Sequence, residues 1–136
     1  CVVIKLFVPE PESDDIQQII NEAEDLTCSE LLLAEFQSAL MRKRREGQFD
    51  ASTAEEFMAA LRKNIEDNSI QLVKLDSSTI EFAVKLLEMM PESIPLRTLD
   101  AIHLSVCHEN KIFPMFTTDK VMLKAAKHLD IPLAEN

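Results

Sequence analysis

Short apolar segments alternate with amphipathic helical segments along this chain, and this alternation constrains the fold more than any other feature of the sequence. Extended segments are predicted around Leu26 and over residues 70–75, 112–117 and 131–134. Strands that are separated by helices pair in parallel, because the connection must cross over the sheet. The sequence therefore predicts an α/β fold of three layers, α/β/α, with a central and mainly parallel sheet.

The helical segments are predicted from apolar residues three or four positions apart and from the signals at their ends. Three of them begin with a capping box, in which a Ser or Thr and a Glu three residues later satisfy free backbone groups. The three boxes are Thr27–Glu30, Ser52–Glu55 and Ser78–Glu81. Gly47, the only glycine, is expected to end the first of these helices in a left-handed conformation. Further helices are predicted over residues 98–110 and 120–129.

The size and charge of the chain limit the classes of function. Its 136 residues, 46% of them hydrophobic, are enough for one core, so we expect one domain over residues 1–136. The formal net charge of −10 argues against a general electrostatic grip on nucleic acid, which relies on clustered Lys and Arg. A nucleic-acid partner would have to be met by a local basic patch or by bound cations.

Cysteine spacing and hydropathy predict a location. Cys1, Cys28 and Cys107 are odd in number and widely spaced, so we expect reduced thiols of a cytoplasmic protein rather than a disulfide or zinc site. No apolar run approaches the roughly 18 residues of a membrane span, and no signal peptide is evident. No membrane partner is expected.

Three carboxylates occupy positions that suit a catalytic or metal-binding role. Glu35 lies on or beside the apolar stripe of its helix, Asp100 falls in the first turn of the next-to-last helix, and Asp119 directly follows the segment 112–117. Each also has an ordinary explanation. Glu35 can reach solvent or pair with a cation, Asp100 can complement the helix dipole, and Asp119 can serve as an N-cap.

Taken together, the acids indicate a metal site. The βα arrangement can bring Asp100 and Asp119 to the same end of a parallel sheet, where ligands bind. Converging carboxylates repel unless a cation neutralises them, and Mg²⁺ or Mn²⁺ suits a few carboxylates with open positions for phosphate oxygens. Metal-assisted hydrolysis of a phosphodiester is the chemistry that such a site supports.

Four segments resemble one family in the same order along the chain. They are IKLFVPEPES at 4–13, SELLLAEF at 29–36, LRTLDAIHL at 96–104 and FTTD at 116–119. Together they resemble the PIN-domain family, especially the VapC-type ribonuclease toxins of bacterial and archaeal toxin–antitoxin pairs. The resemblance implies an endoribonuclease that uses Mg²⁺ or Mn²⁺, a cognate antitoxin that inserts over the site, and a homodimer. The apolar helices near the start of the chain, with Phe36 and Phe57, are candidates for the dimer surface.

The resemblance also assigns residues. By match, the metal-binding and catalytic acids are Glu35, Asp100 and Asp119, and the hydroxyl of Thr117 is a candidate for orienting the site. The alternative for Thr117 is a β-branched residue that completes a strand. Arg97 and Lys120 flank the acids and are candidates for contacts with RNA phosphates, although solvation at the surface is the more common role for each residue taken alone.

The beginning of the chain departs from the family pattern. Alignment on Ile4–Phe7 places the family's first aspartate, at the end of its first strand, two positions before Cys1. We therefore expect a strand and a fourth acid upstream of the printed sequence, and a helix over residues 2–7 in spite of their β-branched composition. Two rival functions remain open: a catalytically incomplete PIN-like binding module and a phospho-receiver domain.

Overall fold

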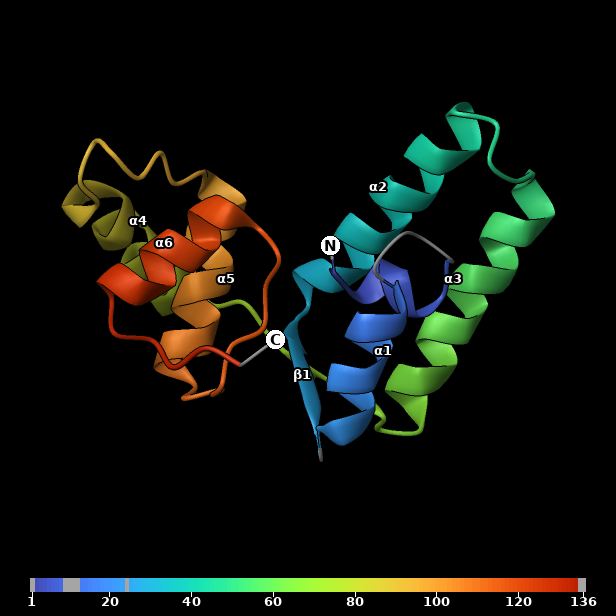
Figure 1. Cartoon of the computed structure of the whole chain (residues 1–136), viewed down its shortest axis with the longest axis horizontal. Helices are drawn as coiled ribbons and strands as arrows, with labels where there is room; N and C mark the ends of the chain where they lie inside the picture. The colour runs from blue at the N-terminus through green and yellow to red at the C-terminus, as the bar shows by residue number, and fades with distance from the viewer. Residues whose placement is uncertain (1, 9–12, 24, 135–136) are drawn as a thin grey trace. The chain divides into compact units, whose positions relative to one another are not determined.

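The computed structural model describes residues 2–8, 13–23 and 25–134. The chain divides into two compact units, Cys1–Val73 and Lys74–Asn136. Helices dominate both units (Figure 1), and short parallel strands occur in the first. Residues 9–12 of the segment IKLFVPEPES lie outside the described residues.

The first unit places two parallel strands among helices. Its elements are η1 (Val2–Leu6, a 3-10 helix), α1 (Ser13–Glu22), β1 (Leu26–Ser29), α2 (Leu31–Arg45), α3 (Ala51–Glu66) and β2 (Ile70–Val73). The strands β1 and β2 pair in parallel, with Leu26 opposite Ile70 and Ser29 opposite Val73. Parallel pairing across intervening helices is the arrangement that the sequence predicts.

The helix predicted over residues 2–7 from the family resemblance is confirmed, whereas the strand that residue propensity favours is not formed. Residues Val2–Leu6 form η1, although β-branched residues favour strands. Its residues Val3 and Ile4 are buried in the core of the first unit. Phe7 then packs its ring edge-to-face against Phe36, with the ring centroids 5.4 Å apart. Tertiary packing therefore decides the conformation of this segment.

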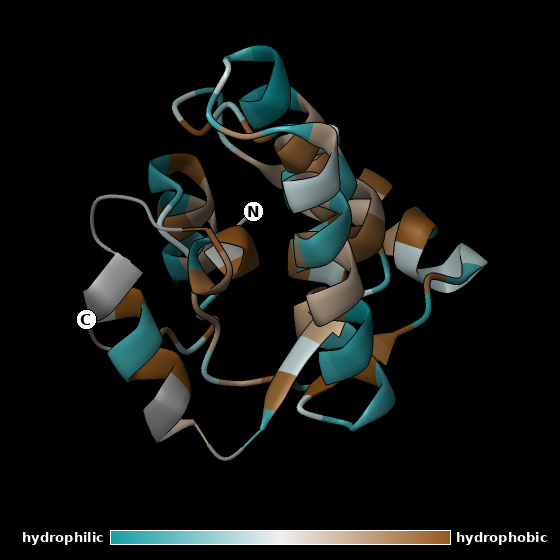
Figure 2. Cartoon of the chain, turned by 90° about the vertical axis from the view of Figure 1, so that its right-hand side faces the viewer, coloured by the Kyte–Doolittle hydropathy of each residue, from teal (hydrophilic) through white to brown (hydrophobic). Residues whose placement is uncertain are grey.

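The core of the first unit lies between its helices and strands. Phe36 and Leu40 of α2 and Leu61 of α3 are fully buried there. The helices α2 and α3 run in opposite directions (Figure 1) and are joined through Gly47, whose φ of +76° is left-handed as predicted. Figure 2 shows hydrophobic and hydrophilic residues alternating along the helices, as expected for helices that bury one face.

The predicted capping boxes are wrong. Thr27–Ser29 belong to β1, and Glu30, the N-cap of α2, makes no cap bond with its side chain. Its N–H instead donates to the Val73 carbonyl at 2.9 Å, which extends the contact between the strands. The helices α3 and α4 begin before the predicted boxes, because Asp50 and Asp76 cap them through their carboxylates.

The second unit is built from three helices, α4 (Ser77–Met89), α5 (Thr98–Glu109) and α6 (Lys120–His128). Its core gathers apolar side chains from all three. Its buried members are Leu86, Leu104, Cys107, Met115, Met122, Ala125, Ala126 and Ile131. The predicted helices over residues 98–110 and 120–129 are thus confirmed to within a residue.

The predicted strands over residues 112–117 and 131–134 are not formed as regular strands. A single parallel bridge, between Met115 and Leu133, is what remains of their pairing. Pro114 has no N–H to donate, so it cannot extend the ladder on its side of the bridge. Across the described ranges, every helix is too short or too polar to span a lipid bilayer.

Candidate metal-binding site

Asp100 is held at the beginning of α5. It is the third residue of the helix, after Thr98 and Leu99, and its side chain is only 11% exposed. The following residues, Ala101 and Ile102, are buried, so packing of the helix face fixes the position of the carboxylate. Its Oδ2 atom accepts a hydrogen bond from Nε of Arg97 at 3.0 Å.

Asp119 is held at the beginning of α6 as its N-cap. Its Oδ1 atom accepts the N–H groups of Val121 at 2.8 Å and of Met122 at 3.0 Å. These bonds satisfy backbone donors that have no partner within the helix. The second oxygen, Oδ2, is left for another partner and lies 3.5 Å from Nη2 of Arg97.

One guanidinium thus bridges the two carboxylates. Arg97 is the N-cap residue of α5, makes no cap bond with its side chain, and has a side chain that is 73% exposed. Its hydrogen bond to Asp100, together with the charges of Asp100 and Asp119, raises the pKa of the Arg97 guanidinium above its usual range. The two predicted acids of the second unit therefore do meet, through a cation that the protein itself supplies.

Thr117 acts on Asp119 through the backbone. Its side chain is buried, and its Oγ1 accepts the N–H of Asp119 at 3.1 Å. The hydroxyl in turn points to Sδ of Met122 at 3.8 Å. The interpretation of Thr117 as the end of a strand is wrong, since no regular strand forms there. The hydroxyl instead fixes the backbone from which the Asp119 carboxylate projects.

Glu35 belongs to α2 in the first unit. Its side chain is half-buried, in keeping with a position at the edge of the apolar stripe. Burial, and secondarily the charge of Glu35, raises the pKa of the Cys28 thiol to about 11. Both Cys28 and Cys107 are free thiols, as the spacing of the cysteines predicts. Lys120, at the first position of α6, is exposed to solvent.

The donor set fits a hard divalent cation in part. Asp100 and Asp119 offer two carboxylates, which together with water and phosphate oxygens are the usual ligands of protein-bound Mg²⁺. Among the described residues, no group of three or more His, Cys, Asp or Glu side chains is placed to hold a metal ion. What the second unit provides is therefore an acid pair, not a complete cage.

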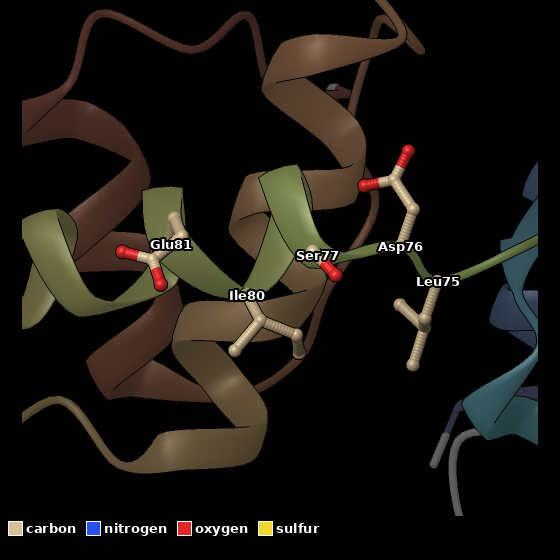
Figure 3. Close-up of a pocket in the computed structure, with 5 residues that line it drawn as sticks. All are labelled: Leu75, Asp76, Ser77, Ile80 and Glu81. Atoms are coloured by element: carbon tan, nitrogen blue, oxygen red, sulfur yellow. The ribbon is translucent and has the colours of Figure 1, made fainter.

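A hollow of about 410 Å³ at the start of α4 is a separate feature of the second unit (Figure 3). It is lined by residues 75–77 together with Ile80 and Glu81, and none of the candidate acids lines it. Figure 3 shows the side chains of Leu75 and Ile80 pointing to the same side, while the Asp76 carboxylate points the other way. That carboxylate is occupied in capping α4, with its Oδ1 2.9 Å from the N–H of Thr79.

The comparisons with known proteins identify the family. Residues 1–128 match the PIN domain. The chain belongs to the PIN-domain family. PIN domains are generally metal-dependent nucleases that bind RNA, and they typically use divalent metal ions. No curated protein and no solved structure matches the chain.

The α/β fold with parallel strands agrees with this membership. Sequence reasoning missed the ion pairs of Arg97. The spacing of Arg97 and Asp100 by three residues predicts one of them, because such residues are neighbours on a helix. The contact with Asp119 joins residues far apart in the sequence and depends on the packing of α5 against α6, which no local pattern encodes.

Proposed function

We propose that this PIN domain is an endoribonuclease that hydrolyses RNA phosphodiesters with Mg²⁺ or Mn²⁺, and that Asp100 and Asp119 are its metal-binding and catalytic acids. The observation that carries the proposal is the convergence of both carboxylates on one guanidinium, Arg97. Two acids that lie close enough to share one cation can also share a metal ion. Family membership supplies the class of reaction.

The side chains divide the work. Asp100 presents a nearly buried carboxylate from the rigid start of α5, and Asp119 presents the oxygen that the helix cap leaves over. Thr117 keeps the Asp119 backbone in place. A Mg²⁺ or Mn²⁺ ion held by Asp100 and Asp119 would supply an activated water and would offset negative charge on the phosphate. Arg97 and Lys120 are positioned at the beginnings of α5 and α6, from which they contact RNA phosphates.

We propose Glu35 as a further metal-binding acid because the segment SELLLAEF at 29–36 resembles the corresponding segment of the family. Its half-buried carboxylate on α2 is the third acid of the set. A third carboxylate would add a ligand for the cation, and the bound cation would give this acidic chain a local positive charge for a polyanion. The single domain over residues 1–136 is proposed because one PIN-domain match spans both compact units, over residues 1–128.

The biological role that we propose is that of the VapC-type toxin of a toxin–antitoxin pair, acting in the cytoplasm as a homodimer that its antitoxin blocks. Expression in a bacterial host tests the role, since growth arrest that Asp100→Asn abolishes is expected. A protein that causes no arrest contradicts the toxin assignment. Light scattering after size-exclusion chromatography tests the dimer, and a monomer mass at all concentrations contradicts it.

Phe36 does not fit the candidate dimer surface near the start of the chain. Phe36 was expected beside Phe57 on the surface of the first helices, but its side chain is fully buried against Phe7. An exposed apolar stripe instead follows α4, where Ile80, Val84 and Leu87 are each more than a third exposed. This stripe supports the proposal of a protein partner.

RNA cleavage tests the catalytic proposal. The intact chain is incubated with single-stranded RNA and Mn²⁺, then with excess EDTA, and then with Mn²⁺ restored. Cleavage should stop with EDTA and return with Mn²⁺, and Asp100→Asn should lose it by about a hundredfold or more. Glu109→Gln is the matched control, because it removes one exposed carboxylate from the other end of α5.

Persistence of cleavage in Asp100→Asn at the rate of the control contradicts the proposed mechanism. Binding of RNA without cleavage, by a protein that remains folded, would favour the rival interpretation of the chain as a PIN-like binding module. The two outcomes differ in a simple gel, because bound and shortened RNA migrate differently.

A further inference from the structure

We propose that Arg97 is the resident cation of the acid pair, which neutralises Asp100 and Asp119 in the metal-free protein and competes with the metal ion for the same oxygen atoms. This inference rests on the proposed function, because it concerns the site at which that function would be carried out. It makes Arg97 a positioning residue that sets how tightly metal is held.

The geometry favours competition rather than coexistence. Arg97 uses two different nitrogens of its planar fork, with Nε 3.0 Å from Asp100 Oδ2 and Nη2 3.5 Å from Asp119 Oδ2. Asp119 Oδ1 is committed to the backbone of α6, with bonds to two N–H groups. Oδ2 is therefore the Asp119 atom that a ligand can use, and it is the atom that faces Arg97.

The charges of the two carboxylates favour a guanidinium beside them. Two carboxylates that converge without a cation repel each other, and a positive charge close to both offsets that repulsion. Arg97 provides that charge from within the chain. A guanidinium keeps its charge at every ordinary pH, so Arg97 is a permanent counter-ion of the two acids.

Because Arg97 is exposed, little free energy is needed to separate its guanidinium from the two carboxylates. Its side chain is 73% exposed, whereas that of Asp100 is 11% exposed and is fixed by α5. A metal ion would therefore displace the exposed guanidinium and leave the more buried carboxylate in place. Because exposed ion pairs are weak, the competition should be moderate. The released guanidinium stays tethered at the start of α5, where a phosphate of RNA would arrive.

Titration of the whole chain with Mn²⁺ alone, followed by calorimetry, tests the inference without measuring cleavage. Arg97→Gln should bind Mn²⁺ with a dissociation constant roughly three- to tenfold smaller than that of the wild type, since a competing charge about one ion-pair distance away is removed. Lys124→Gln, which removes an exposed positive charge from α6, should change the constant by about twofold or less. Arg97→Lys keeps the charge without the fork and should fall between wild type and Arg97→Gln.

Each outcome has a distinct meaning. Equal affinities of wild type and Arg97→Gln, with binding lost in Asp100→Asn, overturn the inference and leave the proposed function intact. An equal gain in Arg97→Gln and Lys124→Gln also overturns it, because net charge alone would then be the cause. A gain specific to Arg97→Gln in a protein that never cleaves RNA supports the inference while the proposed function fails. Absence of Mn²⁺ binding in every protein overturns both.

Discussion

Asp119 performs two tasks with two oxygen atoms, and substitutions can separate them. Oδ1 caps α6 through the N–H groups of Val121 and Met122, at 2.8 and 3.0 Å. Oδ2 is the atom that we assign to the metal. Asn keeps an oxygen for the cap but is not a carboxylate, whereas Ala keeps neither. Asp119→Asn should therefore impair cleavage selectively, and Asp119→Ala should impair both cleavage and stability.

The magnitudes follow from these contacts. Loss of an N-cap to Ala costs about 1 kcal/mol of stability, within a range of about 0.5–2 kcal/mol. The cost should be felt by the whole second unit, since Met122, Ala125 and Ala126 of α6 are buried in its core. Asn should cost roughly 0.3–1 kcal/mol, because it forfeits only the interaction of the charge with the helix dipole. Both variants should lower cleavage by about a hundredfold or more.

Urea denaturation followed by circular dichroism gives the free energies of unfolding, and a fluorescent RNA gives the cleavage rates with Mn²⁺. The reasoning is refuted if Asp119→Asn cleaves RNA as fast as the wild type. It is also refuted if Asn and Ala lower the free energy of unfolding equally, because the cap would then not explain the placement of Oδ1.

Three further predictions concern the support of the site and the cores. Thr117→Val should lower the free energy of unfolding by about 1–3 kcal/mol in urea, because the Asp119 N–H loses its buried acceptor, and Thr117→Ser should recover most of it. Phe36→Ala should lower it by about 3–5 kcal/mol, since the ring is fully buried, and a loss below about 1 kcal/mol would contradict the described core. Burial raises the pKa of the Cys28 thiol from 9.0 to about 11, so the folded state favours the neutral thiol. The contribution of this thiol to the free energy of unfolding is therefore fully present below pH 9. That contribution is lost as pH rises through 11. The free energy of unfolding of the wild type should therefore fall by about 1 kcal/mol more than that of Cys28→Ala between pH 9 and pH 10. Parallel dependence of the two free energies on pH would disprove the burial of the thiol.

The parts of the fold that sequence reasoning predicted are those decided by local pattern and connectivity. The strands at Leu26–Ser29 and Ile70–Val73 pair in parallel because helices separate them, and Gly47 takes the left-handed conformation that ends α2. The helix at Val2–Leu6 was predicted by the family resemblance alone, since its composition favours a strand.

The parts of the fold that were not predicted are those in which a segment has two possible hydrogen-bonding arrangements and tertiary contacts select one. Thr27 can cap a helix or join a strand, and the carbonyl groups of β2 decide the matter by pairing with β1. A continuous strand over residues 112–117 fails because Pro114 cannot donate and because one bridge, at Met115, is all that forms. The expectation that Asp100 and Asp119 meet at strand ends was therefore wrong in its reason. They meet at the beginnings of α5 and α6, through Arg97.

Backbone cleavage directed by Fe²⁺ tests most directly whether Asp100 and Asp119 hold one metal. Fe²⁺ accepts oxygen ligands as Mg²⁺ and Mn²⁺ do, and with ascorbate and peroxide it generates radicals that cut the chain close to the ion. The account predicts fragments, identified by mass spectrometry, that end near residues 100 and 119 and that disappear with excess Mn²⁺ or in Asp100→Asn. Cuts confined to other parts of the chain, or unchanged in Asp100→Asn, would contradict it.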